Sequence, residues 1–313
     1  MNAITPIIRP DRAGLLTPSV AYKPFRYPWA FDMWKKQQQV HWMPEEVPLG
    51  EDVKDWASTL NDNERNLLTQ IFRFFTQADI EVQDNYMERY GRVFKPTEVK
   101  MMLAAFGNME TIHIAAYALL LETIGMPESE FGAFMEYEAM RDKHDYMGQF
   151  GVDSDADICR TLAMFGGFSE GVQLFASFAM LMNFPRHNKM KGMGQIVSWS
   201  VRDESLHCEG IIKLFHTFVA ERDCLTKRVR DDIMAARSCL EADAPPAPTK
   251  GCKWCAWAAA VTTIRIARRS VVSIDGVPVT LVNANDAKSK PRERKSSLGE
   301  VGAFTWPSPP AGP

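Results

Sequence analysis

The chain of 313 residues contains no run of about eighteen or more apolar residues, so the sequence predicts no membrane span. The segment Met1–Leu16 lacks a continuous apolar core and does not resemble a secretory signal. Basic and acidic residues nearly balance, and the net charge of −3 gives no reason to expect a nucleic acid or membrane partner. The six cysteines stand at irregular positions, unlike a disulfide framework, and a reduced, cytoplasmic setting is expected.

Most of the chain instead carries the apolar periodicity of helices. Residues 1–50 differ, because they are rich in proline and aromatic side chains, and we expect an N-terminal arm with a short helix near Trp29–Val40. From Asn61 the helical pattern takes over with a sequence typical of a capping box. The pattern predicts helices from Asn61, from Pro96 to Gly125, over Glu128–Phe150, from Asp153 or Ser154 to Phe184, over Gly192–Glu221 and over 225–240.

Four carboxylates lie on predicted helix faces that are otherwise apolar. Burying an ionised carboxylate without a partner costs several kcal/mol or more, and four such costs in one domain require a common partner. A pair of metal ions accounts for all four at once. The four residues are Asp79, Glu110, Glu170 and Glu204.

Two of the four carboxylates belong to Glu-x-x-His motifs, Glu110–His113 and Glu204–His207. Positions i and i+3 project from the same helix face, so each motif offers a carboxylate oxygen and an imidazole nitrogen to one ion. Two such helices with two further carboxylate helices match the ligand arrangement of dimetal carboxylate four-helix bundles. Oxygen-rich ligation with one imidazole per ion suits iron or manganese better than zinc.

The sequence therefore predicts an all-α fold, a ferritin-like helical bundle over residues 51–238 with a dimetal carboxylate site. One copy of Glu-x-x-His on a helix occurs often by chance, whereas two copies on buried faces, each with an acidic helix upstream, favour a metal site. The predicted ligands are Asp79, Glu110, His113, Glu170, Glu204 and His207.

Tyr117 lies one turn beyond His113 on the face that carries the predicted ligands. A buried tyrosine is usually a large apolar group whose hydroxyl finds a partner. Beside a dimetal site that activates oxygen, it is also a one-electron donor. The residues themselves leave both interpretations open.

These residues together resemble the small, radical-generating subunit of class I ribonucleotide reductase. The ligand set matches in type and spacing, and Tyr117 stands where that family keeps its radical tyrosine. The segment Trp42–Val47 resembles the family's Trp-x-Pro-Glu-Glu sequence, and Asp203 resembles the acid that links this tryptophan to a metal-bound histidine. The resemblance covers about residues 20–238. Ferritins, rubrerythrins and acyl desaturases share the Glu-x-x-His pairs but neither the tryptophan arm nor the tyrosine.

The resemblance implies a radical mechanism. Tyr117 gives an electron to two iron ions, or to two manganese ions, after these have reacted with oxygen or a reduced oxygen species, and becomes a stable tyrosyl radical. Leu174 and Phe178 stand where the family forms an apolar pocket that shields the radical. Their interpretation as ordinary core residues is equally valid, since here the core would form the shield. The tyrosine at 117 and the aspartate at 79 argue against the family's manganese–iron variant.

The resemblance also implies partners. The radical passes by proton-coupled steps to a large catalytic subunit, where a ribonucleoside diphosphate is reduced at its 2′ position in the thioredoxin-type reaction. The chain itself binds no nucleotide and is expected to form a homodimer. The residues implied in the transfer are His113, Asp203 and Trp42.

The resemblance ends at about residue 238. The family continues with further helices and a tail that bears a redox-active tyrosine and a docking peptide, whereas no tyrosine follows Tyr146 here. The runs Val271–Ile274 and Val277–Val282, separated by Asp275-Gly276, predict a β-hairpin, and residues 284–313 are expected to be disordered. Residues 239–313 are therefore expected to form a short segment foreign to the family.

Three origins of this segment stay open: a frameshift or fusion of the natural gene, an inserted element such as the start of an intein at Cys239, and a small domain in which Cys252 and Cys255 form a redox or zinc pair. Each of them puts docking on the large subunit in question.

Two other functions stay open as well. The chain could be a dimetal oxidase or an iron-binding ferritin-like protein without a partner, or a truncated and inactive relative. Tyr117 and Trp42 favour the reductase subunit over the oxidase, and only the C-terminal segment favours the inactive relative.

Overall fold

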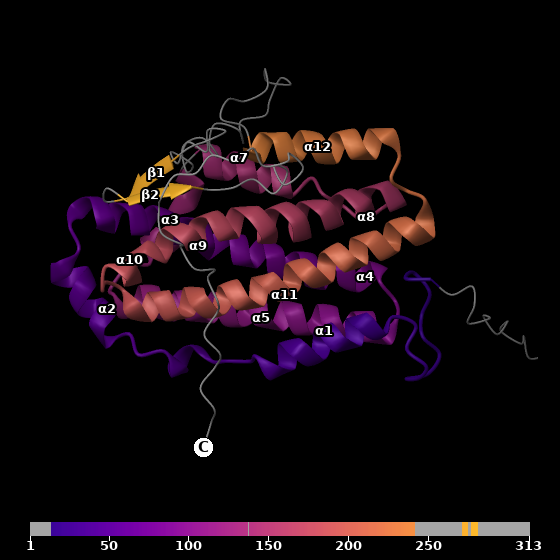
Figure 1. Cartoon of the computed structure of the whole chain (residues 1–313), viewed down its shortest axis with the longest axis horizontal. Coiled ribbons are helices and arrows are strands. Elements are labelled where there is room, and N and C mark those ends of the chain that lie inside the picture. The colour runs from indigo at the N-terminus through magenta and orange to yellow at the C-terminus, as the bar shows by residue number, and fades with distance from the viewer. Residues whose placement is uncertain (1–13, 137, 242–270, 275–276, 281–313) are drawn as a thin grey trace, which may run out of the picture. The chain divides into compact units, whose positions relative to one another are not determined.

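The computed structural model describes residues 14–136, 138–241, 271–274 and 277–280 (Figure 1). The chain divides into two units, Met1–Thr263 and Ile264–Pro313. Every element described in the first unit is a helix, and the second unit contributes two short strands. The all-α fold predicted for the bundle is therefore confirmed.

The N-terminal part of the first unit contains α1 (Pro28–Gln39), η2 (Pro44–Glu46), α2 (Gly50–Lys54) and η3 (Asp55–Thr59). The central part contains α3 (Asp62–Asp84), η4 (Asn85–Tyr90), α4 (Gly91–Val93), α5 (Thr97–Thr123), α6 (Ser129–Gly132), η5 (Ala133–Glu136) and α7 (Glu138–Met147). The last part contains α8 (Asp155–Leu162), η6 (Ala163–Gln173), α9 (Leu174–Leu181), α10 (Asn183–Arg186), α11 (Lys191–Arg222) and α12 (Lys227–Glu241). Of these, η3, η4 and η6 are π-helical, and η2 and η5 are 3₁₀ turns.

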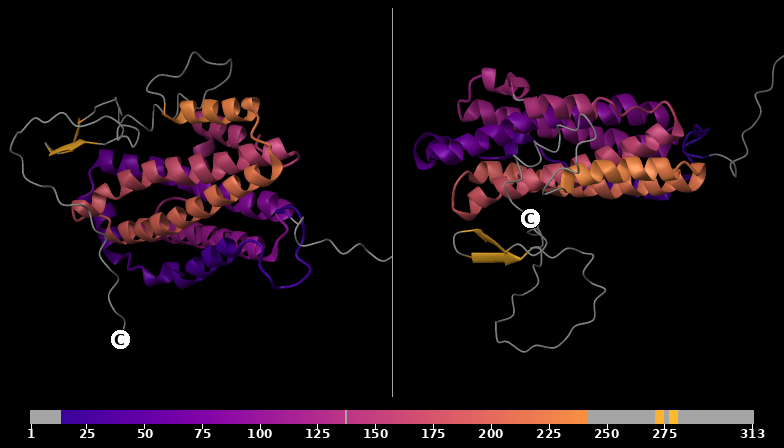
Figure 2. Two further views of the ribbon diagram at one scale, coloured as in Figure 1. Left: turned by 45° about the vertical axis from the view of Figure 1, so that its right-hand side comes forward. Right: turned by 90° about the horizontal axis from the view of Figure 1, so that it is seen from above.

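The long helices run side by side in both views of Figure 2. α5 packs against α1, α3 and α11, while α11 also packs against α8, η6 and α9. Among the described residues, no helix combines the length and the apolar character needed to cross a membrane.

Two large hydrophobic clusters fill most of the interior of this unit, beside a small third one of Met147, Met164 and Phe165, and the long helices pass from one large cluster into the other. Each long helix leaves one cluster and enters the other over a short stretch, and the predicted metal ligands lie in or next to these stretches. We call this polar layer between the two clusters the waist. In each stretch, the last residue of one cluster and the first residue of the other are Ala78 and Val82 on α3, Phe106 and Met109 on α5, Leu162 on α8 and Leu174 on α9, and Val197 and Ile211 on α11.

Close approach of η6 to α11 depends on a glycine. A Cβ atom added at Gly166 would lie 2.2 Å from Cγ2 of Ile211, so no larger residue fits there without displacing a helix. Since Gly166 lies one turn before Glu170, this contact also sets the distance at which Glu170 faces α11.

Three of the predicted helices begin where the sequence places them. Asn61 caps α3, because its side chain accepts the Glu64 amide at 3.0 Å while the Glu64 carboxylate accepts the Asn61 amide at 2.9 Å. Ser154 caps α8 by accepting the Asp157 amide at 3.2 Å. Pro96 precedes α5, as expected of a residue that cannot donate within a helix.

Two predicted helices are divided in the structure. The segment predicted over Glu128–Phe150 consists of α6, η5 and α7, and the one predicted from Ser154 to Phe184 consists of α8, η6, α9 and α10. Apolar periodicity assumes a constant helical period, and the π-helical turns of η6, which include Gly166, Gly167 and Gly171, break that assumption.

The N-terminus of α11 is held by a buried aspartate of α2. Asp52 accepts the Gly192 amide at Oδ2 (2.8 Å) and the Met193 amide at Oδ1 (2.7 Å), and Asp55 accepts the Met190 amide at 2.8 Å. A Cβ at Gly192 would lie 2.8 Å from Asp52 Oδ2, so glycine is required for this contact. The helix predicted from Gly192 therefore begins one residue earlier, at Lys191, and Gly192 lies inside its first turn.

The second unit holds a two-stranded antiparallel sheet of β1 (Val271–Ile274) and β2 (Val277–Thr280). Its register pairs Val271 with Thr280 and Ile274 with Val277, so the predicted hairpin is present. The disorder expected for 284–313, the cysteine pair Cys252 and Cys255, and the side chain of Cys239 all lie outside the described residues.

Replacing Asp52 by alanine is expected to destabilise the first unit by about 2 kcal/mol, because two amides at the start of α11 would lose a charged acceptor. Urea unfolding followed by circular dichroism measures this difference. Glu51→Ala is the matched control, since Glu51 lies on the same helix but is exposed and, among the described residues, pairs with Lys54 alone. Equal unfolding midpoints for the two variants would show that the cap contributes nothing.

Candidate dimetal centre

The six predicted ligands come from four stretches of helix that meet at the waist. Asp79 lies on α3, Glu110 and His113 on α5, and Glu170 on η6, while Glu204 and His207 lie on α11. All six side chains are buried, the most exposed being Asp79 at 3%. The i, i+3 spacing on α5 and α11 places each histidine beside its own glutamate.

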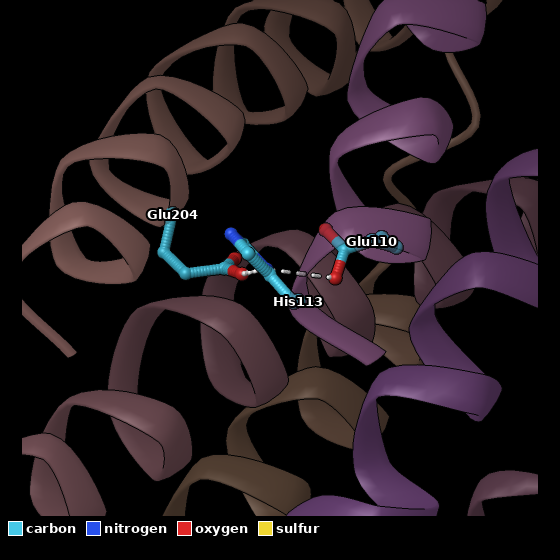
Figure 3. A group of neighbouring side chains, drawn as sticks. All are labelled: Glu110, His113 and Glu204. Atoms are coloured by element: carbon cyan, nitrogen blue, oxygen red, sulfur yellow. Dashed lines mark ion pairs between the residues drawn. The ribbon is translucent and has the colours of Figure 1, made fainter. Parts of the chain in front are cut away.

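One group of donors consists of Glu110, His113 and Glu204. Nδ1 of His113 lies 3.4 Å from Glu110 Oε2 and 3.2 Å from Glu204 Oε1. Figure 3 shows the His113 ring between the two carboxylates, one from α5 and one from α11. The group thus joins two helices that are far apart in sequence.

A second group of donors consists of Glu170, Glu204 and His207. Nδ1 of His207 lies 3.5 Å from Glu204 Oε2 and 3.9 Å from Glu170 Oε2. It also lies 2.9 Å from Glu110 Oε1, the carboxylate of the first group. Glu204 belongs to both groups, so the two form one continuous cluster with a shared carboxylate.

Asp79 stands apart from both groups. Its carboxylate interacts electrostatically with His113, Glu110 and Glu204, and its Oδ2 atom is buried without a hydrogen-bond partner among the described residues. Its place as the sixth ligand stays a prediction.

The hydrogen-bonding state of the cluster fits a pair of metal ions. Within the described part of the chain, both Glu110 oxygens, both Glu204 oxygens and both ring nitrogens of His207 form no hydrogen bond, although Nδ1 of His207 lies within ion-pair distance of both carboxylates. Buried donors and acceptors are rarely left in this state, and each costs roughly 1–3 kcal/mol. Converging oxygen and nitrogen lone pairs are what hard or borderline cations require.

Charge in the metal-free cluster is balanced by the histidines. Burial raises the pKa values of Asp79 and Glu170 well above their usual range. Burial also acts to raise the pKa of Glu110, but the adjacent His113 and His207 outweigh it and lower that pKa to about 2. Burial lowers the pKa of His207, and the Glu110 and Glu204 carboxylates overcome this effect and raise it to about 10.

A line of polar contacts leads out of the cluster towards the N-terminal arm. Nε2 of His113 lies 3.4 Å from Asp203 Oδ2, and the same oxygen accepts the indole N–H of Trp42 at 2.8 Å. All three side chains are buried. The structure therefore brings together the three residues that the sequence predicts for radical transfer.

Tyr117 lies in an aromatic layer of the first hydrophobic cluster. Its ring stacks on Phe75 with centroids 4.8 Å apart, and Phe75 stacks on Phe178 at 5.4 Å. Leu174 belongs to the same cluster. Burial and then the Asp79 carboxylate raise the pKa of Tyr117, while the nearby Ser200 hydroxyl acts to lower it. The predicted pocket residues Leu174 and Phe178 thus lie in the same cluster as the tyrosine.

Sequence reasoning missed other residues around the cluster. Tyr86 donates its hydroxyl to Glu170, and Gln37 and Arg202 each approach Asp203 Oδ1 at 3.4 Å. Tyr86 stands seven positions after Asp79, but the π-helical segment η4 begins at Asn85, so the α-helical period of α3 does not point to it. Gln37 lies in the aromatic arm, where no periodic pattern points to it.

Comparison with known proteins identifies relatives of the chain. The family model described as "Ribonucleotide reductase, small chain" matches residues 19–239. A protein of Invertebrate iridescent virus 6 named "Probable ribonucleoside-diphosphate reductase small subunit 376L" is 45% identical over 227 residues, which are 68% of this chain and 63% of that protein. The chain therefore spans less than two thirds of the length of this relative.

Solved structures share the fold. The ribonucleotide reductase R2 subunit from Clostridium botulinum superposes with a TM-score of 0.66 and 22% identity, over 77% of this chain and 75% of that one. An R2-like ligand-binding oxidase with a reconstituted Mn/Fe cofactor gives a TM-score of 0.53 and 18% identity, over 68% of this chain and 84% of the oxidase. At these identities the likeness concerns the fold alone.

Metal affinity is expected to increase with pH. The Glu110 and Glu204 carboxylates raise the pKa of His207 to about 10, and Asp203, Glu110 and Glu204 raise that of His113, so protons held by these rings must leave when a metal ion binds. Between pH values of about 6 and 8, the affinity for Mn²⁺ should rise roughly tenfold per pH unit for each proton displaced.

Isothermal titration calorimetry in buffers of different ionisation enthalpy measures both the affinity and the number of protons released. Glu204→Ala removes the shared carboxylate and should abolish binding at every pH. An affinity that does not change with pH would contradict the protonated state of the two histidines.

Proposed function

The chain belongs to the family of ribonucleotide reductase small chains, and from this premise we propose that it generates a tyrosyl radical on Tyr117 for a ribonucleoside-diphosphate reductase. Two metal ions would be held by the six residues of the waist. Two iron ions are proposed, with two manganese ions as the alternative. When bound and oxidised by oxygen, they supply the oxidising power for removing one electron from a nearby tyrosine.

The surroundings of Tyr117 support its role as the radical residue. The ring is buried, stacks on Phe75 and lies in the same hydrophobic cluster as Leu174 and Phe178, so water and reductants are kept away from it. Asp79 is close enough to influence the hydroxyl electrostatically. We propose that the hydroxyl proton leaves towards this carboxylate as the ring is oxidised.

The contact line Trp42–Asp203–His113 is the single observation that carries the proposal. A metal-storage or oxidase site has no need of a buried indole joined to a ligand through a carboxylate. Asp203 accepts the indole N–H, so the loss of an electron from Trp42 can be accompanied by proton transfer to Asp203 Oδ2. Burial by itself would raise the pKa of Asp203, but His113 above all, then the indole N–H of Trp42 and the charge of Arg202, lower it and keep this carboxylate ionised.

The partners proposed for the chain follow from its family. Trp42 would deliver the oxidising equivalent to a large catalytic subunit, which binds and reduces the ribonucleotide. A homodimer is proposed for the small chain itself. The second candidate function, a dimetal oxidase without a partner, is favoured only by the fold shared with the R2-like ligand-binding oxidase.

The proposed domain division is an N-terminal arm over 1–50, a dimetal bundle over 51–238 and a segment foreign to the family over 239–313. The family match, which ends at residue 239, supports the last boundary. A truncated and inactive relative would have the same division, and only the radical assay below separates it from an active subunit.

Loading the metal-free chain with ferrous iron and oxygen should produce a tyrosyl signal in the electron paramagnetic resonance spectrum. Tyr117→Phe should remove this stable signal while both iron ions remain bound, because the hydroxyl of Tyr117 is not among the metal donors. Metal content measured on the same sample is the control. Two bound irons without any tyrosyl signal in the unaltered chain would leave the oxidase or the inactive relative as the better assignment.

The boundary at residue 239 is tested at the level of the gene. If a frameshift created the C-terminal segment, another reading frame of the coding DNA beyond codon 239 should encode a continuation of the small-chain family. Resequencing that region and translating all frames is the measurement. Absence of such a continuation in every frame would rule out the frameshift and leave a fusion, an insertion or a separate small domain.

A further inference from the structure

Tyr86 is a buried tyrosine that touches the ligand cluster from the side opposite to the first hydrophobic cluster. It is 1% exposed and belongs to the second hydrophobic cluster. It lies on η4, the π-helical segment that follows α3 directly. Its hydroxyl donates to Glu170 Oε2 at 2.8 Å and lies 3.1 Å from Oε1.

The ring of Tyr86 is fixed independently of this hydrogen bond. It meets the rings of Phe106 and His207 edge to face, with centroids 6.0 and 5.8 Å away. The backbone of α5 approaches closely at Gly107, where an added Cβ would lie 3.2 Å from Cβ of Tyr86. A ring held on several sides gives its hydroxyl a fixed direction, and that direction is towards Glu170.

The two donor groups are supported in different ways. In the first group, Asp203 supports the histidine, because its Oδ2 atom lies 3.4 Å from Nε2 of His113. In the second group, Nδ1 of His207 faces the Glu110 and Glu204 carboxylates, but its Nε2 has no hydrogen-bond partner among the described residues. Support for the second group instead comes through its carboxylate, from Tyr86. Residues that orient metal ligands commonly alter metal affinity by 10–100-fold, so this asymmetry has consequences for binding.

A neighbouring tyrosine shows what a purely structural role looks like. Tyr90 lies one turn beyond Tyr86 on the same segment and is equally buried, and its hydroxyl donates to the backbone oxygen of Thr161 at 3.2 Å. Tyr90 therefore satisfies its hydroxyl without touching a side chain of the cluster. The two tyrosines differ in the acceptor that they use, which makes them a matched pair.

We propose that Tyr86 is a positioning residue of the metal centre: its hydroxyl holds the Glu170 carboxylate in place and so sets the affinity of the ion bound by Glu170, Glu204 and His207. The inference rests on the proposed dimetal function. It adds a residue that acts through a ligand and does not itself bind metal.

The test compares Tyr86→Phe and Tyr90→Phe in the full chain. Each is titrated with Mn²⁺ while free Mn²⁺ is counted by electron paramagnetic resonance. Tyr86→Phe should keep one ion at wild-type affinity and bind the other about 10–100-fold more weakly. Tyr90→Phe should bind both ions as the unaltered chain does. Thermal unfolding of the metal-free variants checks that both remain folded.

Two results for Tyr86→Phe would overturn the inference. If both ions bind with unaltered affinity, the hydrogen bond does not matter for metal binding. If both ions weaken together and the unfolding midpoint falls, Tyr86 is a structural residue. If the unaltered chain itself fails to bind two ions, it is the proposed function that is refuted.

A second pair of variants removes the ring and isolates the hydrogen-bond donor. Tyr86→Gln and Tyr86→Leu leave side chains of similar size, but only glutamine can donate to Glu170. The glutamine variant should bind the weaker ion more tightly than the leucine variant, by several-fold or more. Equal affinity in the two variants would overturn the inference even if Tyr86→Phe proved too unstable to measure.

Discussion

Four carboxylates and two imidazoles are buried together at the waist, and the cost of burying them constrains the rest of the first unit. Such a layer is tolerated only if the charges compensate one another or share a cation. In the metal-free state the histidines do this, which is why the pKa of Glu110 falls and that of His207 rises. The helices that carry these residues must therefore meet at one level, and apolar packing is divided into a cluster on either side.

The sequence is most informative where local chemistry decides the structure. Asn61 with Glu64 marks the start of α3, and Pro96 marks the start of α5, because capping and the missing amide of proline act within a few residues. It is least informative from Ser154 to Phe184, where an even helical period suggests one helix. The π-helical turns of η6 insert extra residues per turn, and they are accommodated by contacts such as that of Gly166 with Ile211, which no local pattern contains.

In the candidate site too, the features set by local spacing could be predicted and those set by distant contacts could not. Five of the six predicted ligands lie in two overlapping groups, and each Glu-x-x-His pair lies within one helix face as its spacing predicts. The positions of Asp203 and Trp42 beside His113 depend on how the N-terminal arm crosses α5 and α11, and only resemblance to a family predicted them. Tyr86 was missed because η4 changes the helical register just before it, so its direction cannot be read from the α-helical period of α3.

Division of the interior into two clusters has a consequence for how the unit opens. Each cluster holds together by its own apolar contacts, and the layer between them contributes little hydrophobic cohesion. Amide hydrogen exchange in the metal-free chain would then follow two separate cooperative openings, one around Phe75 and Phe178 and one around Phe106 and Phe218. A cation bound by residues of α5, η6 and α11 would join the two openings into one cooperative transition. The metal centre would then also make the bundle a single folding unit.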